Sequence, residues 1–67
     1  MRVEVEFDRE DDGRWIAEIT NLPGAMAYGQ TKESALAAVE AIALRALAER
    51  LETEQESLKT SVEFACA

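Results

Sequence analysis

Carboxylates at alternate positions before a glycine are the feature of this 67-residue sequence most suggestive of chemistry. Asp8, Glu10 and Asp12 precede Gly13, with the spacing of the first half of a calcium-binding loop. Such a loop needs a bidentate glutamate at its twelfth position, which here is Ile19. The segment therefore predicts a solvated hairpin loop rather than a calcium site.

Three other carboxylates raise the possibility of a metal-dependent nuclease. Glu4, Glu6 and Glu18 alternate with apolar residues, so they fall on the polar side of two expected strands. Two-metal chemistry requires acidic groups that converge on one site from separate elements. A solvated surface explains these three residues better, and a nuclease is the weakest functional hypothesis.

The remaining reactive residue types are scarce. The chain has no histidine and a single cysteine, Cys66, which excludes a Ser-His or Cys-His nucleophile, a histidine-ligated zinc site and an internal disulfide. No cation or helix start adjoins Cys66 to activate its thiol. We expect no enzymatic activity, no metal and no cofactor.

Charge and length point toward association with another protein. Fourteen Asp and Glu against seven Lys and Arg give a net charge of −7, which disfavours direct nucleic-acid binding and favours a basic partner. Solubility alone would explain this charge equally well. A chain this short buries little core, so we also expect a homo-oligomer.

Without a signal-like or membrane-spanning apolar run, a cytoplasmic location is the default expectation.

Alternating apolar residues predict two paired strands at about 2–8 and 14–20. Their shared apolar face holds Val3, Val5, Phe7, Trp15, Ala17 and Ile19. Ile16 falls on the opposite, polar face, where it is either incidental or marks an interface.

After the turn at residues 22–24, a third strand is expected at about 25–28. Ala25 and Ala27 are small enough to lie beneath a helix, which would turn Met26 and Tyr28 outward.

A helix is predicted at about 32–51, with Thr31 as its N-cap. Ser34 stands where a glutamate would complete a capping box, so that box is expected to be absent. The end of the helix is unmarked, because the apolar period continues to Leu58 across a polar stretch.

A fourth strand is expected at about 61–65. The chain thus predicts one α+β domain over 1–67, of order β-β-β-α-β, with a three- to four-stranded, mainly antiparallel sheet and one helix on one face.

The ordered motifs of the first half of the chain resemble the HicB-like antitoxin family. The matching residues are Asp12, Gly13, Trp15, Ala17, Leu22, Pro23, Gly24, Gly29, Thr31, Ala35 and Leu36. The resemblance implies the same element order, as a truncated ribonuclease H-like sheet. It also implies a binding function, in which the chain neutralises a small basic HicA-type mRNA-cleaving toxin by covering its active surface. Ala25 departs from the cysteine that is frequent at its position in the family.

Many members of this family add a C-terminal DNA-binding segment, and this sequence ends at Ala67 without one. Autoregulation is therefore not expected. The expected partner contacts are Asp11, Asp12, Met26 and Tyr28. The expected oligomer contacts are Ile16, Leu51 and Leu58. The alternative function is a structural or regulatory homo-oligomer that has no toxin partner.

Overall fold

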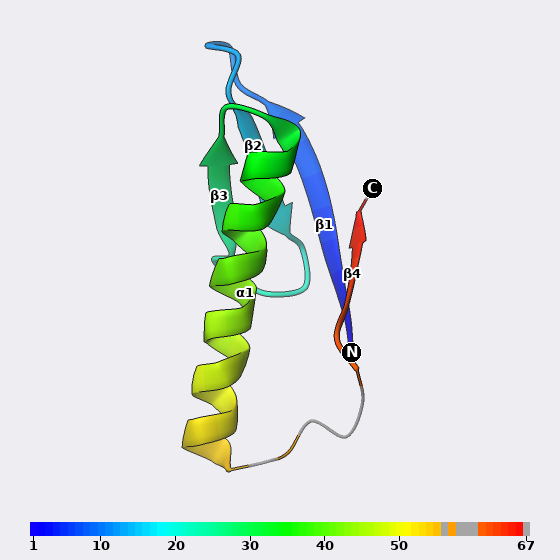
Figure 1. The fold of residues 1–67 in the computed structure, drawn as a ribbon, viewed down its shortest axis with the longest axis vertical. Helices are drawn as coiled ribbons and strands as arrows, with labels where there is room; N and C mark the ends of the chain where they lie inside the picture. The colour runs from blue at the N-terminus through cyan, green and yellow to red at the C-terminus, as the bar shows by residue number, and fades with distance from the viewer. Residues whose placement is uncertain (56, 58–60, 67) are drawn as a thin grey trace.

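The computed structural model of the chain describes residues 1–55, 57 and 61–66. In chain order these residues form β1 (Arg2–Arg9), β2 (Trp15–Ile19), β3 (Met26–Gly29), α1 (Lys32–Glu54) and β4 (Glu63–Cys66). The strands make one sheet in the order β3-β2-β1-β4, and α1 lies across one face of it (Figure 1). The expected α+β fold and element order are confirmed.

The sheet is mixed rather than purely antiparallel. β2 pairs antiparallel with both β1 and β3, whereas β4 runs parallel to β1. A parallel neighbour requires a crossover connection, and α1 supplies most of it. The first and last strands are consequently partners, with Arg2 opposite Glu63 and Val3 opposite Phe64.

The core lies between α1 and the sheet and is built from small side chains. Its buried residues are Val3, Val5, Ala17, Ile19, Ala25, Ala27, Ala35, Val39, Ala43 and Leu47. Phe7 and Trp15 share this face as expected, but both are only half-buried and pack against the rim of the core. The ammonium nitrogen of Lys32 lies 4.8 Å from the ring centroid of Phe7 and 5.8 Å from that of Trp15, which partly shields both rings.

The start of α1 corrects one expectation, because a capping box is present. The Thr31 hydroxyl accepts a hydrogen bond from the Ser34 backbone N–H at 3.1 Å, and the Ser34 hydroxyl accepts one from the Thr31 N–H at 3.1 Å. The serine side chain is short, but it makes the return bond that glutamate usually provides.

The end of α1 also differs from the expected position near Leu51. The helix continues to Glu54, and Gln55 then adopts a left-handed conformation with φ 54° and donates its N–H to the Leu51 carbonyl. An ion pair of 3.1 Å between Arg50 and Glu54 links the last turns. No glycine or proline interrupts this stretch, so α1 extends past the sheet in a molecule 42 Å long (Figure 1).

The strand bounds differ from expectation by one or two residues. β1 extends to Arg9, β2 is shorter at both ends, and β3 begins and ends one residue later. β4 begins at Glu63, whose N–H bonds to the Met1 carbonyl at 2.8 Å. Pairing with β1 determines where β4 begins. The alternating pattern from Ser61 onward therefore predicted a start two residues too early.

Gly29 ends β3 where the strand approaches the first turn of α1. A Cβ atom at this position would lie 2.4 Å from the Ala35 backbone nitrogen and 2.4 Å from the Ser34 hydroxyl oxygen. Only a residue without a side chain permits this close approach. It explains why position 29 is a glycine even though its φ is not positive.

Candidate partner-binding surface

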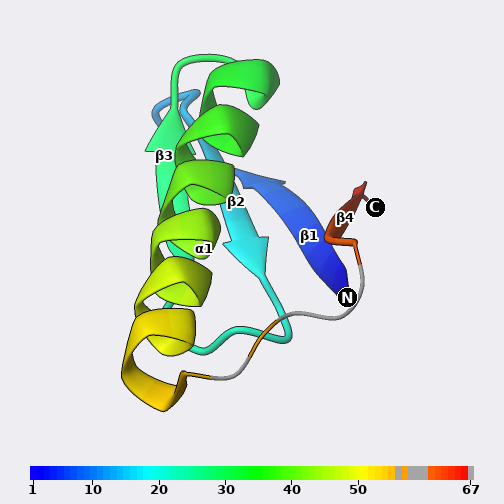
Figure 2. The same ribbon diagram turned by 60° about the horizontal axis from the view of Figure 1, so that its bottom comes forward.

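The face of the sheet opposite α1, here called the outer face, is not covered by any other described element (Figure 2). Strand register places alternate residues of all four strands on it. They are Met26, Tyr28, Ile16, Glu18, Arg2, Glu4, Glu6, Asp8, Glu63 and Ala65. Apolar side chains therefore lie toward β3 and carboxylates toward β1.

The acidic half of the outer face contains a directly opposed pair of like charges. Glu6 of β1 is the register partner of Glu18 of β2, an arrangement that destabilises a sheet. None of the ion pairs between described residues involves Glu4, Glu6 or Glu18. An open hollow of about 230 Å³ beside them is lined by Glu6, Phe7, Asp8, Glu10, Ile16 and Glu18. The cation on this half of the face, Arg2, pairs with Glu63, so Glu4, Glu6 and Glu18 have no ion-pair partner among the described residues.

The apolar half of the outer face lies on β3 and the adjoining part of β2. Met26 is 43% exposed and Tyr28 is 47% exposed, so the expectation that both side chains turn outward is confirmed. Ile16 lies directly opposite Tyr28 and is half-buried. Exposed aromatic and methionine side chains are typical of protein interfaces. Ile16 thus belongs to the same surface as Met26 and Tyr28.

The β1–β2 hairpin loop is connected to this surface through Arg14. The Asp12 carboxylate accepts hydrogen bonds from the Arg14 backbone N–H at 3.0 Å and from its guanidinium Nε at 2.8 Å. The guanidinium carbon lies 4.7 Å from the centroid of the Tyr28 ring. The backbone hydrogen bond from Arg14, aided by its side chain and charge, lowers the pKa of Asp12 below its usual 3.8. Gly13, at φ 90°, supplies the positive φ of the turn.

The structure brings together three of the four expected partner contacts. Asp12 and Tyr28 are joined by Arg14, and Met26 lies two residues before Tyr28 on the same strand face. Asp11 is exposed in the same hairpin loop. Sequence reasoning missed Arg14, although its spacing of two residues from Asp12 is typical of a turn stabilised by an aspartate side chain.

The expected oligomer contacts do not form one surface. Ile16 is on the outer face, whereas Leu51 is half-buried near the end of α1. Leu58 lies outside the described residues. The exposure of Leu44 on α1, which is 50% exposed, was not anticipated.

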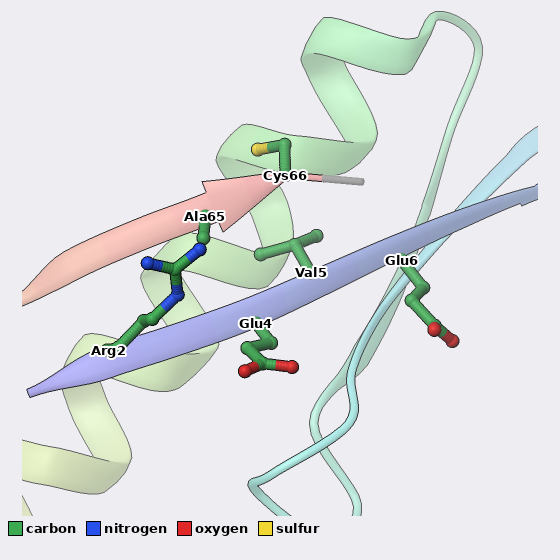
Figure 3. A pocket seen from close by; sticks show the side chains of 6 residues that line it. All are labelled: Arg2, Glu4, Val5, Glu6, Ala65 and Cys66. Atoms are coloured by element: carbon green, nitrogen blue, oxygen red, sulfur yellow. The ribbon is translucent and has the colours of Figure 1, made fainter.

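Groups suited to chemistry are sparse on the part of the chain that the structure describes. No cluster of three or more His, Cys, Asp or Glu side chains there is arranged to hold a metal ion, and no polar side chain there is buried. Cys66 is exposed. It lines an open hollow of about 200 Å³ with Arg2, Glu4, Val5, Glu6 and Ala65 (Figure 3). In Figure 3, Val5 and Cys66 project to the side of the sheet facing α1, away from Glu4 and Glu6.

Among the described residues, no helix is both long enough and apolar enough to cross a lipid bilayer. Comparisons with family models, with curated proteins and with solved structures returned no match for this chain.

Proposed function

We propose that this chain is a protein-binding module of antitoxin type, which captures a small basic protein on the outer face of its sheet. The observation that carries the proposal is the composition of that face, where carboxylates without ion-pair partners adjoin an exposed Tyr28 and Met26. A partner with lysines or arginines beside an apolar contact complements both halves. The motif resemblance to HicB-like antitoxins points to a HicA-type mRNA-cleaving toxin as that partner.

Neutralisation would follow from coverage rather than from chemistry. RNA could not reach the catalytic surface of a toxin that is bound across the outer face, and this requires no reactive group from the chain. The acidic half would also accelerate encounter with a basic protein, because complementary fields steer association.

The direct test is co-expression of this chain with a short, basic, histidine-containing reading frame encoded beside it. We expect restored growth of a host that the toxin alone inhibits, and co-purification of the two proteins. Absence of both would contradict the antitoxin proposal and leave the structural or regulatory homo-oligomer as the alternative.

Charge-matched variants would locate the contact. Glu6→Gln with Glu18→Gln removes two carboxylates from the outer face, whereas Glu49→Gln with Glu52→Gln removes two exposed carboxylates from α1. We expect titration calorimetry to show about tenfold weaker binding for the first pair, equivalent to about 1.4 kcal/mol, and little change for the second. Equal effects would mean that overall charge, rather than this face, attracts the partner.

A further inference from the structure

The described elements cover only part of the face of the sheet toward α1, called the inner face. α1 packs on β2 and β3, and it lies to one side of β1 and β4 in both ribbon views (Figures 1 and 2). Phe7 of β1 and Phe64 of β4 are therefore only half-buried, although both belong to the apolar side of the sheet. Ile42 and Val62 are also half-buried beside the core.

An apolar groove runs between the first turns of α1 and β4. It has a volume of about 140 Å³ and is lined by Phe7, Lys32, Glu33, Leu36 and Cys66. Lys32 and Glu33 give its rim one charge of each sign. The groove therefore lacks the excess negative charge of the outer face, which would repel a second copy of this acidic chain.

The groove adjoins a free sheet edge. β4 ends the strand order, so no described strand pairs with the backbone of its far side. The opposite edge, β3, differs on the inner face, where Ala25 and Ala27 are already buried beneath α1, and its exposed apolar side chains lie on the outer face. At β4 a single added strand would complete the ladder and lie beside the half-buried Phe64 and Val62 of the inner face.

We propose that the added strand is β4 of a second copy, paired antiparallel about a two-fold axis through Phe64. The two sheets would join into one continuous sheet of eight strands with both helices on the same side. Such an interface is isologous, so each chain supplies to its partner the same strand edge that it receives. It leaves both outer faces uncovered, and it does not depend on the existence of a basic partner.

The alternation of β4 selects this register. Directly opposed residues of an antiparallel pair project to the same face, and a two-fold axis perpendicular to the sheet preserves the inner face. Centring on Phe64 places Phe64 opposite its counterpart, Val62 opposite Cys66 and, on the outer side, Glu63 opposite Ala65. Centring on Glu63 would instead oppose two carboxylates. Centring on Ala65 would replace the contact between two Phe64 rings with Phe64 opposite Cys66.

The first measurement is the mass of the wild-type chain in solution. We expect sedimentation equilibrium at micromolar concentration to give twice the chain mass of 7.4 kDa. A mass of one chain throughout the micromolar range would overturn the proposal.

A cysteine pair would test the register. Val62→Cys places a thiol opposite the partner's native Cys66, and mild oxidation with oxidised glutathione should give a covalent dimer with two disulfides. Residues 62 and 66 of one strand are about 13 Å apart, too far for an internal disulfide, which needs Cα atoms within about 7 Å. Glu63→Cys, one residue along and on the outer side, is the matched control that should crosslink poorly. Equal crosslinking of the two variants, or crosslinking of the control alone, would overturn the register.

Charge insertion would separate this interface from other apolar surfaces. We expect Phe64→Lys to halve the mass, while Leu44→Lys on α1 and Ile16→Lys on the outer face leave the dimer intact. Dissociation by either of the last two variants but not by Phe64→Lys would place the interface elsewhere and overturn the proposal. If Phe64→Lys fails to fold, the crosslinking result decides alone, because Val62→Cys retains Phe64.

Discussion

At the scale of single residues, the outer face shows an arrangement that stability alone does not favour. Glu6 and Glu18 are directly opposed, and the only arginines near this face are engaged, Arg2 with Glu63 at 3.8 Å and Arg14 with Asp12 at 2.8 Å. Exposed ion pairs of this kind contribute little. The opposed glutamates therefore do not stabilise the fold, as the proposed binding role of the outer face would allow.

Glu18→Gln should therefore affect folding and binding in opposite directions. Removing one charge relieves the repulsion with Glu6 and should raise the free energy of unfolding by about 0.2–1 kcal/mol, while binding of the basic partner weakens. Urea denaturation and calorimetry would measure the two effects. Glu49→Gln is the control, and a loss of stability in Glu18→Gln would refute the repulsion argument.

Asp12 should give the hairpin loop a pH dependence. Its pKa is lowered in the folded chain, so its stabilising contribution is present above the unfolded value near 3.8 and is lost as the pH falls through the lower folded value. Asp12→Asn should remove this part of the acid sensitivity. Urea midpoints measured across the acidic range would show a shallower slope than wild type, with Asp11→Asn as the control for charge alone.

At the scale of elements, the junction between β3 and α1 determines how closely the helix approaches the sheet. Gly29 permits backbone contact there, and the Thr31–Ser34 capping box satisfies two N–H groups at the start of α1. The alanines of the buried helix stripe continue this close approach along α1. A core of small side chains is the consequence of the short distance between layers.

Gly29→Ala should destabilise the fold by about 1–3 kcal/mol, since the new methyl group meets the backbone of Ala35 as well as the Ser34 hydroxyl, and the helix backbone cannot move aside cheaply. The lower entropy of the unfolded alanine variant offsets only part of this cost. Thermal and urea denaturation would measure it. An unchanged midpoint would show that β3 and α1 separate without cost.

Ser34→Ala should cost about 0.5–1 kcal/mol, because the Thr31 backbone N–H loses its acceptor. Ser34→Glu supplies a carboxylate that can accept the same hydrogen bond from the Thr31 N–H, so it should recover the lost stability. Failure of Ser34→Glu to exceed Ser34→Ala in urea midpoint would mean that the return bond contributes nothing.

At the scale of the whole molecule, two surfaces with different chemistry lie on different parts of the sheet. The outer face is acidic with an apolar end, whereas the groove beside β4 is apolar with a balanced rim. A dimer joined at β4 would present two outer faces on one side of a continuous sheet. One partner with two linked binding sites would then bind its second site with increased effective concentration.

If folding and dimerisation are linked, thermal stability must depend on protein concentration. We expect the melting temperature of the wild-type chain to rise with concentration, since the dimer forms from folded chains only. Phe64→Lys should melt at a temperature that does not change with concentration. A constant melting temperature for wild type would argue against a coupled dimer.

Local patterns predicted most of this fold, because alternation and helical period report which side of each element is buried. Val3, Val5, Ala17 and Ile19 were placed correctly by that argument, as were Met26 and Tyr28 on the outside. The capping box and the end of α1 were missed, because they depend on hydroxyl geometry and on a left-handed Gln55 that no residue type announces. The opposition of Glu6 and Glu18 and the bridging position of Arg14 could not be predicted without the strand register. That register is known only once the β1–β2 hairpin is formed.

The pairing of β4 with β1 joins residues separated by most of the chain, as Arg2 opposite Glu63 shows. Strands β1 to β3 and α1 are contiguous in sequence, so they can assemble through shorter chain closures before β4 arrives. During synthesis the backbone groups on one edge of β1 therefore remain unpaired until β4 has been made. Release of β4 from the finished domain would exchange one exposed strand edge for another that is twice as long.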